Sequence, residues 1–204
     1  SIRRQRQMCI RDRIYMIPIM DSKRQYAKIG DKMEEAVLEV MRSGSYILGK
    51  NNKAFEEEFA AYCGTKYAVA LNSGTDALHV ALRALDIGKG DEVITTAFTF
   101  VATTEAIGIV GAKPVFADID KDTFNIDAEK IEALITPNTK AIIPVHLYGQ
   151  PCEMDKIMDI AKRHNLHVIE DACQGIGSEY KGQKVGSFGT FGCFSFYPTK
   201  NLGT

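Results

Sequence analysis

Lys200 is a candidate for covalent chemistry because of its place in the chain. It follows the apolar stretch from Phe191 to Phe196, and Pro198 stands between them. Proline cannot continue a strand ladder, so we expect Lys200 just past the end of a buried strand. Partial burial makes an amine easier to deprotonate, and a neutral amine can form a Schiff base. An isolated loop lysine is more often an ordinary solvated side chain. Whether Lys200 is a catalytic residue therefore depends on the other candidate residues.

The segment Asn72-Ser73-Gly74-Thr75-Asp76 stands between an expected strand and an expected helix. The first N–H groups of a helix lack partners inside the helix, and the helix dipole is positive there. This helix end therefore suits a phosphate group. The competing interpretation is a plain N-cap by Ser73 or Thr75.

Two further segments place an aromatic ring and a carboxylate at similar positions. The aromatic rings of Phe98-Thr99-Phe100 can lie against a flat heterocycle or belong to the core. The segment from Glu170 to Gln174 follows the apolar residues Val168 and Ile169. We expect its carboxylate to be desolvated and to need a cation or hydrogen-bond donors. A helix or turn cap is the competing interpretation of Asp171.

Alternating strands and helices position these four segments. We expect strands at 67–71, 92–95, 114–117, 141–145 and 167–170 and helices at 31–43, 53–63, 73–85, 101–110, 127–135 and 154–163, with a hairpin turn at 181–183. Short links between alternating elements predict an α/β fold with a mostly parallel sheet covered by helices on both faces. Ligands of such sheets bind beyond the carboxyl ends of the strands, where all four segments stand.

The composition argues against several classes of protein. The formal net charge of −1 leaves no electrostatic footprint for nucleic acid or a membrane surface. The cysteines are scattered without a C-x-x-C pair, so we expect reduced thiols in a cytoplasmic protein and no metal site. No apolar run reaches the length of a membrane span.

Two nucleotide-binding motifs are absent. The segment 44–51 looks like a P-loop, but Asn51 replaces the Ser or Thr that would hold magnesium, and a helix rather than a strand precedes it. The G-x-G-x-x-G fingerprint of dinucleotide-binding domains follows none of the expected strands.

Residues 1–13 differ from the rest of the chain. They are rich in arginine and contain no apolar core of a secretory signal. A nucleic-acid arm, a transit peptide and a non-native extension are the possible interpretations, and we favour the last because ordinary sequence begins near Met16. We therefore expect residues 1–15 to be a disordered extension.

Six motifs, in this order and spacing, resemble those of the DegT/DnrJ/EryC1/StrS sugar aminotransferases, pyridoxal phosphate enzymes with the type I aminotransferase fold. The similarity runs from Ile17 to Thr204. Its carriers are Gly44-Ser45-Tyr46-Ile47-Leu48-Gly49, Asn72-Ser73-Gly74-Thr75-Asp76-Ala77-Leu78, Gly90-Asp91-Glu92-Val93-Ile94, Pro144-Val145-His146-Leu147-Tyr148-Gly149, Ile169-Glu170-Asp171-Ala172 and Phe196-Tyr197-Pro198-Thr199-Lys200-Asn201-Leu202-Gly203.

The resemblance implies a role for each residue around the cofactor ring. Lys200 would form the Schiff base with the aldehyde of pyridoxal 5'-phosphate and then act as the base that moves the proton. Asp171 would pair with the pyridinium nitrogen, so that the ring acts as an electron sink. Gln174 would bind the ring hydroxyl, and Phe100 would stack on the ring.

The resemblance also implies how the cofactor phosphate is held. Thr75, the backbone N–H of Asp76 and Ser195 would bind it, with Ser73 and Gly74 in the same cofactor-binding loop.

The implied reaction transfers an amine from an amino acid, expected to be glutamate, to a keto group on a nucleotide-activated sugar. The ending 197–203 looks more like members that act on 3-keto than on 4-keto sugars, and Lys200 argues against the dehydratase branch, where histidine replaces the lysine. Residues 16–204 would be the large cofactor-binding domain, incomplete and without its C-terminal small domain. The full-length parent would be a homodimer. A non-catalytic α/β nucleotide-binding domain and an inactive fragment of the aminotransferase are the alternatives.

Overall fold

The computed structural model of the protein describes residues 20–203. The extension expected at residues 1–15 lies outside this range. The chain divides into two compact units, Ser1–Gly49 and Lys50–Thr204, and each is described by itself.

The first unit contains one long helix, α2 (Ser22–Ser43). It begins earlier than the helix expected at 31–43 because Asp21 caps it, accepting the N–H of Arg24 at 3.0 Å. Gly44 ends it in the left-handed conformation, with φ 68°. Three apolar side chains of this helix, Met33, Val37 and Met41, are exposed by 41%, 57% and 59%.

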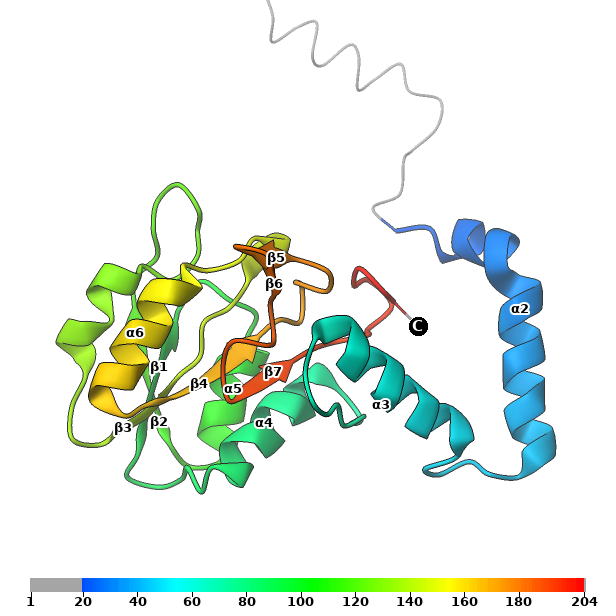
Figure 1. Cartoon of the computed structure of the whole chain (residues 1–204), viewed down its shortest axis with the longest axis horizontal. Helices are drawn as coiled ribbons and strands as arrows, with labels where there is room; N and C mark the ends of the chain where they lie inside the picture. The colour runs from blue at the N-terminus through cyan, green and yellow to red at the C-terminus, as the bar shows by residue number, and fades with distance from the viewer. Residues whose placement is uncertain (1–19, 204) are drawn as a thin grey trace, which may run out of the picture. The chain divides into compact units, whose positions relative to one another are not determined.

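The second unit is built on a parallel sheet of five strands in the order β2-β1-β3-β4-β7 (Figure 1). The strands are β1 (Glu92–Thr96), β2 (Lys113–Ala117), β3 (Thr139–Ile142), β4 (His167–Asp171) and β7 (Phe191–Cys193). Every pairing within this sheet is parallel. The predicted α/β fold with a mostly parallel sheet is therefore confirmed.

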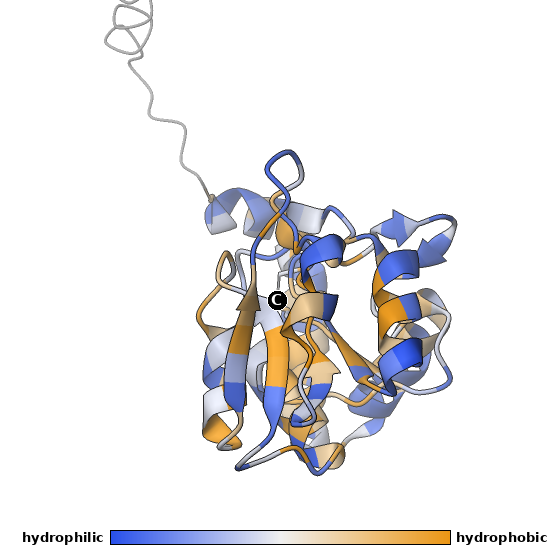
Figure 2. Cartoon of the chain, turned by 90° about the vertical axis from the view of Figure 1, so that its left-hand side faces the viewer, coloured by the Kyte–Doolittle hydropathy of each residue, from blue (hydrophilic) through white to orange (hydrophobic). Residues whose placement is uncertain are grey.

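Helices cover both faces of the sheet, because successive strand residues point to opposite faces. The helices of this unit are α3 (Lys50–Cys63), α4 (Gly74–Ala84), α5 (Ala102–Ile109) and α6 (Met154–His164). Ile169 and Ile143 pack in one core cluster with α4 and α5, whereas their neighbours Val168 and Ile142 pack in the other with α6. Figure 2 shows the hydrophobic residues gathered along the strands.

The predicted hairpin is present as β5 (Glu179–Tyr180) and β6 (Gln183–Lys184). Lys181 and Gly182 form its turn, with φ of 52° and 83°. Positive φ at both central residues is typical of a type I′ turn, whose twist suits two antiparallel strands.

The prediction of a strand at 67–71 is wrong, because the structure has no strand there. Its period-2 pattern is real: Tyr67 and Val69 are exposed by 73% and 74%, and the alanines between and after them are half-buried. A strand also needs a neighbouring ladder, and the N–H of Ala70 instead donates to the Glu56 carboxylate at 2.8 Å.

Two other predicted elements differ from the structure. The helix expected at 127–135 is a pair of 3-10 turns, Ala128–Lys130 and Glu132–Leu134; Pro137 disfavours a helical residue before it and shortens the segment. The strand expected at 141–145 is β3, which ends at Ile142. Pro144 has no N–H for the ladder, although Val145 still forms an isolated bridge with Asp171.

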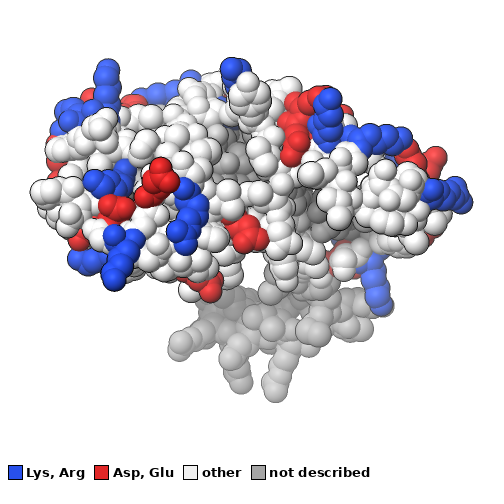
Figure 3. All heavy atoms as spheres, turned by 90° about the horizontal axis from the view of Figure 1, so that it is seen from below, with Lys and Arg blue, Asp and Glu red and all other residues white. Residues whose placement is uncertain are grey.

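Positive and negative side chains are interspersed on the surface seen in Figure 3, as the near-neutral net charge leads us to expect. Between Met20 and Gly203 no helix is both long and apolar enough to cross a membrane.

Candidate active site

The predicted site residues gather around one large cavity of about 1540 Å³ in the second unit. It lies at the carboxyl ends of β4 and β7 and at the start of α4. Its lining includes eight of the nine predicted residues, namely Ser73, Gly74, Thr75, Phe100, Asp171, Gln174, Ser195 and Lys200. Asp76 is not in the lining, but it is adjacent to Thr75 in the first turn of α4.

The start of α4 has the N-cap that the competing interpretation predicted. Ser73 has extended backbone angles, and its hydroxyl accepts the N–H of Asp76 at 3.1 Å. The Asn72 amide donates to the Asp76 carboxylate at 3.0 Å. The Asp76 N–H, predicted to bind phosphate, is thus engaged by Ser73 in this structure. The helix terminus itself still opens on the cavity through Gly74 and Thr75.

Gly74 allows this helix end to approach two other site segments closely. A Cβ at this position would lie 2.8 Å from the Cys173 sulfur and 2.9 Å from the Ser195 Cβ. Side chains do not tolerate such distances to well-packed neighbours. The absence of a Cβ therefore lets the start of α4 contact both the turn after β4 and the segment after β7, so that Ser195 and the α4 terminus lie together.

Asp171 ends β4 as a buried carboxylate, with only 5% of its surface exposed. Its Oδ2 accepts the Thr103 hydroxyl at 2.8 Å, and its Oδ1 accepts the backbone N–H of Cys173 at 3.2 Å. Hydrogen-bond donors thus satisfy part of the carboxylate, as its burial requires. No sequence pattern had pointed to Thr103, which comes from α5 and is itself fully buried.

Glu170, the neighbour of Asp171 in the strand, turns to the opposite face. Its carboxylate accepts the N–H groups of Gly186, Phe188 and Gly189 at 2.7, 2.7 and 2.8 Å and contacts the His146 Nε2 at 3.1 Å. These four contacts fill the capacity of a carboxylate. Glu170 therefore holds the loop before β7 in place.

His146 is held in one tautomer by a second contact. Its Nδ1 accepts the N–H of Cys152 at 3.1 Å, so the ring proton is on Nε2 and donates to Glu170. The pair is completely buried. Burial also raises the pKa of the neighbouring Cys152 thiol to about 12, so this region contains no reactive thiolate at neutral pH.

Lys200 and Asp171 act electrostatically on the same side chain, that of Cys173. Burial raises the pKa of the Cys173 thiol, the Asp171 charge raises it further, and the Lys200 charge partly offsets the rise. The Lys200 backbone N–H donates to the Tyr197 carbonyl at 2.8 Å and closes a turn that contains Pro198. Lys200 and Asp171 therefore both line the cavity and both act on the Cys173 thiol.

The aromatic candidate lies at the mouth of the cavity. Phe100 lines it and is 65% exposed, so its ring is not part of the core. The core interpretation of this residue is wrong. A half-buried Gln174 lines the same cavity.

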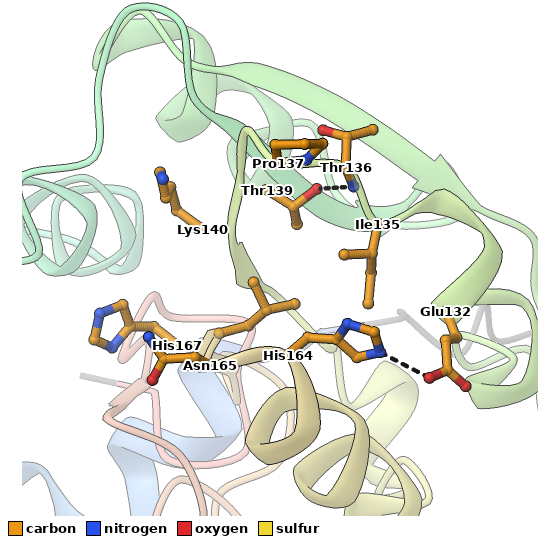
Figure 4. A pocket seen from close by; sticks show the side chains of 10 residues that line it. Glu132, Ile135, Thr136, Pro137, Thr139, Lys140, His164, Asn165 and His167 are labelled. Carbon is orange, nitrogen blue, oxygen red and sulfur yellow. Dashed lines mark hydrogen bonds and ion pairs between the residues drawn. The ribbon is translucent and has the colours of Figure 1, made fainter.

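A second cavity of about 570 Å³ lies at the other edge of the sheet, beside the amino ends of β3 and β4 (Figure 4). Its wall carries Glu132, which pairs with Arg163 and accepts from the His164 Nε2 at 2.7 Å. Lys140 and His167 point away from its centre in Figure 4. Across the described part of the chain, no group of three or more His, Cys, Asp and Glu side chains could hold a metal ion.

A cavity at the carboxyl edge of a parallel sheet, with a helix N-terminus, a buried carboxylate and a lysine in its lining, is typical of α/β proteins that bind phosphorylated ligands. A model of the DegT/DnrJ/EryC1/StrS aminotransferase family matches residues 27–204. The chain belongs to this family, as its motifs indicated.

Curated relatives agree with this membership. A Geobacillus stearothermophilus protein named pleiotropic regulatory protein is 53% identical over 187 residues, covering 92% of this chain and 50% of the relative. The Acidithiobacillus ferrooxidans UDP-N-acetyl-3-dehydro-alpha-D-glucosamine 3-aminotransferase is 51% identical over 187 residues, covering 92% and 51%. The chain therefore spans about half the length of the curated relatives it matches.

Solved structures bear out the fold and the cofactor of the family. S. venezuelae DesV, solved in complex with a ketimine intermediate, has a TM-score of 0.89 at 45% identity and covers 92% of this chain, which covers 50% of DesV. The Bacillus subtilis protein ntda, solved with bound PMP, has a TM-score of 0.87 at 40% identity. The match covers 93% of this chain and 43% of ntda. PMP is the amine form of pyridoxal phosphate, so the predicted cofactor is confirmed for the family.

Proposed function

We propose that this chain is the cofactor-binding part of a pyridoxal phosphate-dependent aminotransferase that aminates a keto group on a nucleotide-activated sugar. The observation that carries the proposal is the gathering of an amine, a buried carboxylate and a helix N-terminus around one cavity, by Lys200, Asp171 and the start of α4. These groups match the aldehyde, the ring nitrogen and the phosphate of the cofactor.

The residues fit the cofactor in size and chemistry. The cavity of about 1540 Å³ exceeds the volume needed for a cofactor with a substrate. The close approach at Gly74 supports a phosphate cradle formed by the α4 terminus, Thr75 and Ser195. An Asp76 contact with the phosphate would require its N–H to share or leave the hydrogen bond with Ser73.

Each remaining residue acts on one part of the bound ring. When bound, the cofactor supplies an electron sink for the carbon that exchanges its amine. Asp171 would lie beside the ring nitrogen, Gln174 would donate to the ring hydroxyl, and Phe100 would cover one ring face. Lys200 would hold the aldehyde carbon through its Nζ, with the aldehyde oxygen leaving as water, and the amine, once released, would take up and return a proton.

The names of the relatives support the choice of substrate. The A. ferrooxidans relative is named for amination at position 3 of a UDP-linked keto sugar. We infer a nucleotide-linked 3-keto sugar as acceptor and glutamate as donor for this protein. We also infer a cytoplasmic location, since the described cysteines are free thiols, and a homodimer for the full-length protein, as the resemblance to the family implies.

A half-reaction tests the proposal without the sugar. The chain is loaded with pyridoxal phosphate, free cofactor is removed, and glutamate is added. Conversion of bound pyridoxal phosphate to pyridoxamine phosphate, measured by chromatography of the released cofactor, is the expected result. A chain that captures no pyridoxal phosphate would contradict the proposal.

The second candidate is a non-catalytic regulatory or nucleotide-binding domain, favoured by the name of the G. stearothermophilus relative. It predicts no covalent capture of pyridoxal phosphate and no change of ligand binding when Lys200 is replaced. An inactive fragment is the third possibility, and it predicts cofactor binding at Lys200 without the half-reaction.

A further inference from the structure

The geometry points to Thr103 as a positioning residue that orients the Asp171 carboxylate toward the cofactor, with Thr99 holding Thr103 in turn. The inference rests on the proposed function, because it assigns Asp171 to the cofactor ring. None of the motifs that identify the family includes Thr99 or Thr103.

The hydrogen bonds form a directed chain. The Thr99 and Thr103 hydroxyl oxygens lie 2.8 Å apart, and the Thr103 hydroxyl lies 2.8 Å from the Asp171 Oδ2. An ionised carboxylate can only accept, so Thr103 donates its single hydroxyl proton to Asp171. The proton between the two threonines must therefore come from Thr99. The chain runs from Thr99 through Thr103 to Asp171.

Hydrogen bonds fix the plane of the Asp171 carboxylate from two sides. Thr103 engages Oδ2, while the Cys173 N–H engages Oδ1 at 3.2 Å. A carboxylate has about four acceptor positions. The Cys173 thiol also hydrogen-bonds this carboxylate, so at least one position remains for a ligand. Asp171 also lines the cavity. The hydrogen bonds thus leave the free lone pairs of a fixed carboxylate to the cofactor.

Burial of the two threonines restricts the orientation of these hydrogen bonds. Thr103 is completely buried on α5, and Thr99 is half-buried in the segment before that helix and lines the cavity. Hydrogen bonds to a charged group are stronger than neutral ones, and in a region of low dielectric they are strengthened further. A carboxylate held in this way loses little conformational entropy when a ring nitrogen binds to it.

A purely structural role predicts something different. If Thr103 only satisfied a buried carboxylate, its loss would lower stability and leave the bound cofactor unchanged. Thr95 provides a matched control, because it is also fully buried and its hydroxyl donates to the Ile143 carbonyl at 2.9 Å, away from Asp171.

The test uses the full chain, with the variants Thr103→Val, Thr103→Ser, Thr99→Val and, as control, Thr95→Val. Two quantities are measured: the Kd for pyridoxal phosphate by absorbance titration, and the visible absorbance maximum of the bound cofactor. Thr103→Val is expected to weaken binding about tenfold and to shift the maximum, because one hydrogen bond to a charged group is lost. Thr103→Ser retains the hydroxyl and is expected to restore the Kd to within about twofold of wild type.

The other two variants decide between positioning and structure. Thr99→Val, on a half-buried residue, is expected to weaken binding about threefold with the same direction of spectral shift. Thr95→Val is expected to lower the Tm and to keep both the Kd and the maximum of wild type.

A Thr103→Val protein with the wild-type Kd and maximum contradicts the inference, and so does a Thr95→Val protein that shows the same changes as Thr103→Val. If Thr103→Val does not fold, a wild-type Kd for Thr99→Val contradicts it. A wild-type chain that binds no pyridoxal phosphate contradicts the proposed function, and the inference with it.

Discussion

Glu170 and Asp171 are neighbours in β4, and their carboxylates serve opposite faces of the sheet. Glu170 accepts three backbone N–H groups of the segment 186–189. Asp171 accepts from Thr103 and Cys173 and lines the large cavity. The alternation of side chains along a strand thus separates a structural carboxylate from the one that faces the ligand.

Asp171→Asn tests the role of the carboxylate that lines the cavity. The change keeps the shape of the side chain and removes its charge, so binding of pyridoxal phosphate should weaken by about 1.5–3 kcal/mol, or roughly 10-fold to 100-fold. Absorbance titration measures this Kd. An unchanged Kd for pyridoxal phosphate would show that the Asp171 charge does not contribute to cofactor binding.

Glu170→Gln is expected to act on stability instead. The new amide presents an NH₂ group to backbone donors where the carboxylate accepted, which leaves at least one buried N–H group without a partner. The expected loss is about 2–3 kcal/mol of unfolding free energy, measured by urea denaturation. Its Kd for pyridoxal phosphate should stay within about threefold of wild type, since the carboxylate lies on the far face. A variant as stable as wild type would contradict the role of Glu170.

Gly74→Ala tests the close approach at the start of α4. The new Cβ would meet the Cys173 sulfur at 2.8 Å and the Ser195 Cβ at 2.9 Å, so the helix end must move. We expect a loss of about 1–3 kcal/mol in unfolding free energy. Binding of pyridoxal phosphate should weaken more than binding of pyridoxal, which has no phosphate, because the phosphate cradle is displaced.

Gly108→Ala is the matched control for this prediction. Gly108 lies inside α5, and a Cβ there would meet nothing within 4 Å. This substitution should stabilise the protein by about 0.5–1 kcal/mol through helix propensity. If both glycine variants lose stability and cofactor affinity alike, the close packing around Gly74 does not cause these losses.

Asp155 gives a pH-dependent contribution to stability. Hydrogen bonds from Lys181 and Tyr180 of the hairpin lower the pKa of this carboxyl from 3.8 to about 2. A lowered pKa in the folded state stabilises the protein above the unfolded value, and this contribution is lost as the pH falls from 3.8 toward 2.

The variant Asp155→Asn should therefore be less stable than wild type at neutral pH, and the difference should disappear across that acidic range. Chemical denaturation of both proteins at a series of pH values measures it. A difference that does not depend on pH would show that the Asp155 charge does not hold the hairpin.

The sequence predicted most of the sheet because the apolar runs are short and separated by turn residues. The strand expected at 92–95 is Glu92–Thr96, and the helix expected at 154–163 is Met154–His164. The pattern failed at 67–71, where alternation is present but no neighbouring ladder accompanies it. Periodicity describes a strand's faces, whereas pairing depends on residues far along the chain.

The candidate site was predictable in part for a similar reason. Strand ends and helix starts are local features, so Asp171, Lys200 and the start of α4 could be named from the sequence. Thr103 could not, because its partner Asp171 lies 68 positions away and a single threonine in a helix carries no signal of its own.

The central claim is that Lys200 captures the cofactor aldehyde in the large cavity. Borohydride reduction of the chain with pyridoxal phosphate, followed by peptide mass spectrometry, tests it directly, with Lys200→Ala and Lys140→Ala as test and control variants. Lys140 is an exposed lysine of the other cavity. We predict one modified peptide, containing Lys200, in wild type and in Lys140→Ala, and none in Lys200→Ala. Labelling spread over surface lysines, or unchanged by the loss of Lys200, would contradict the account.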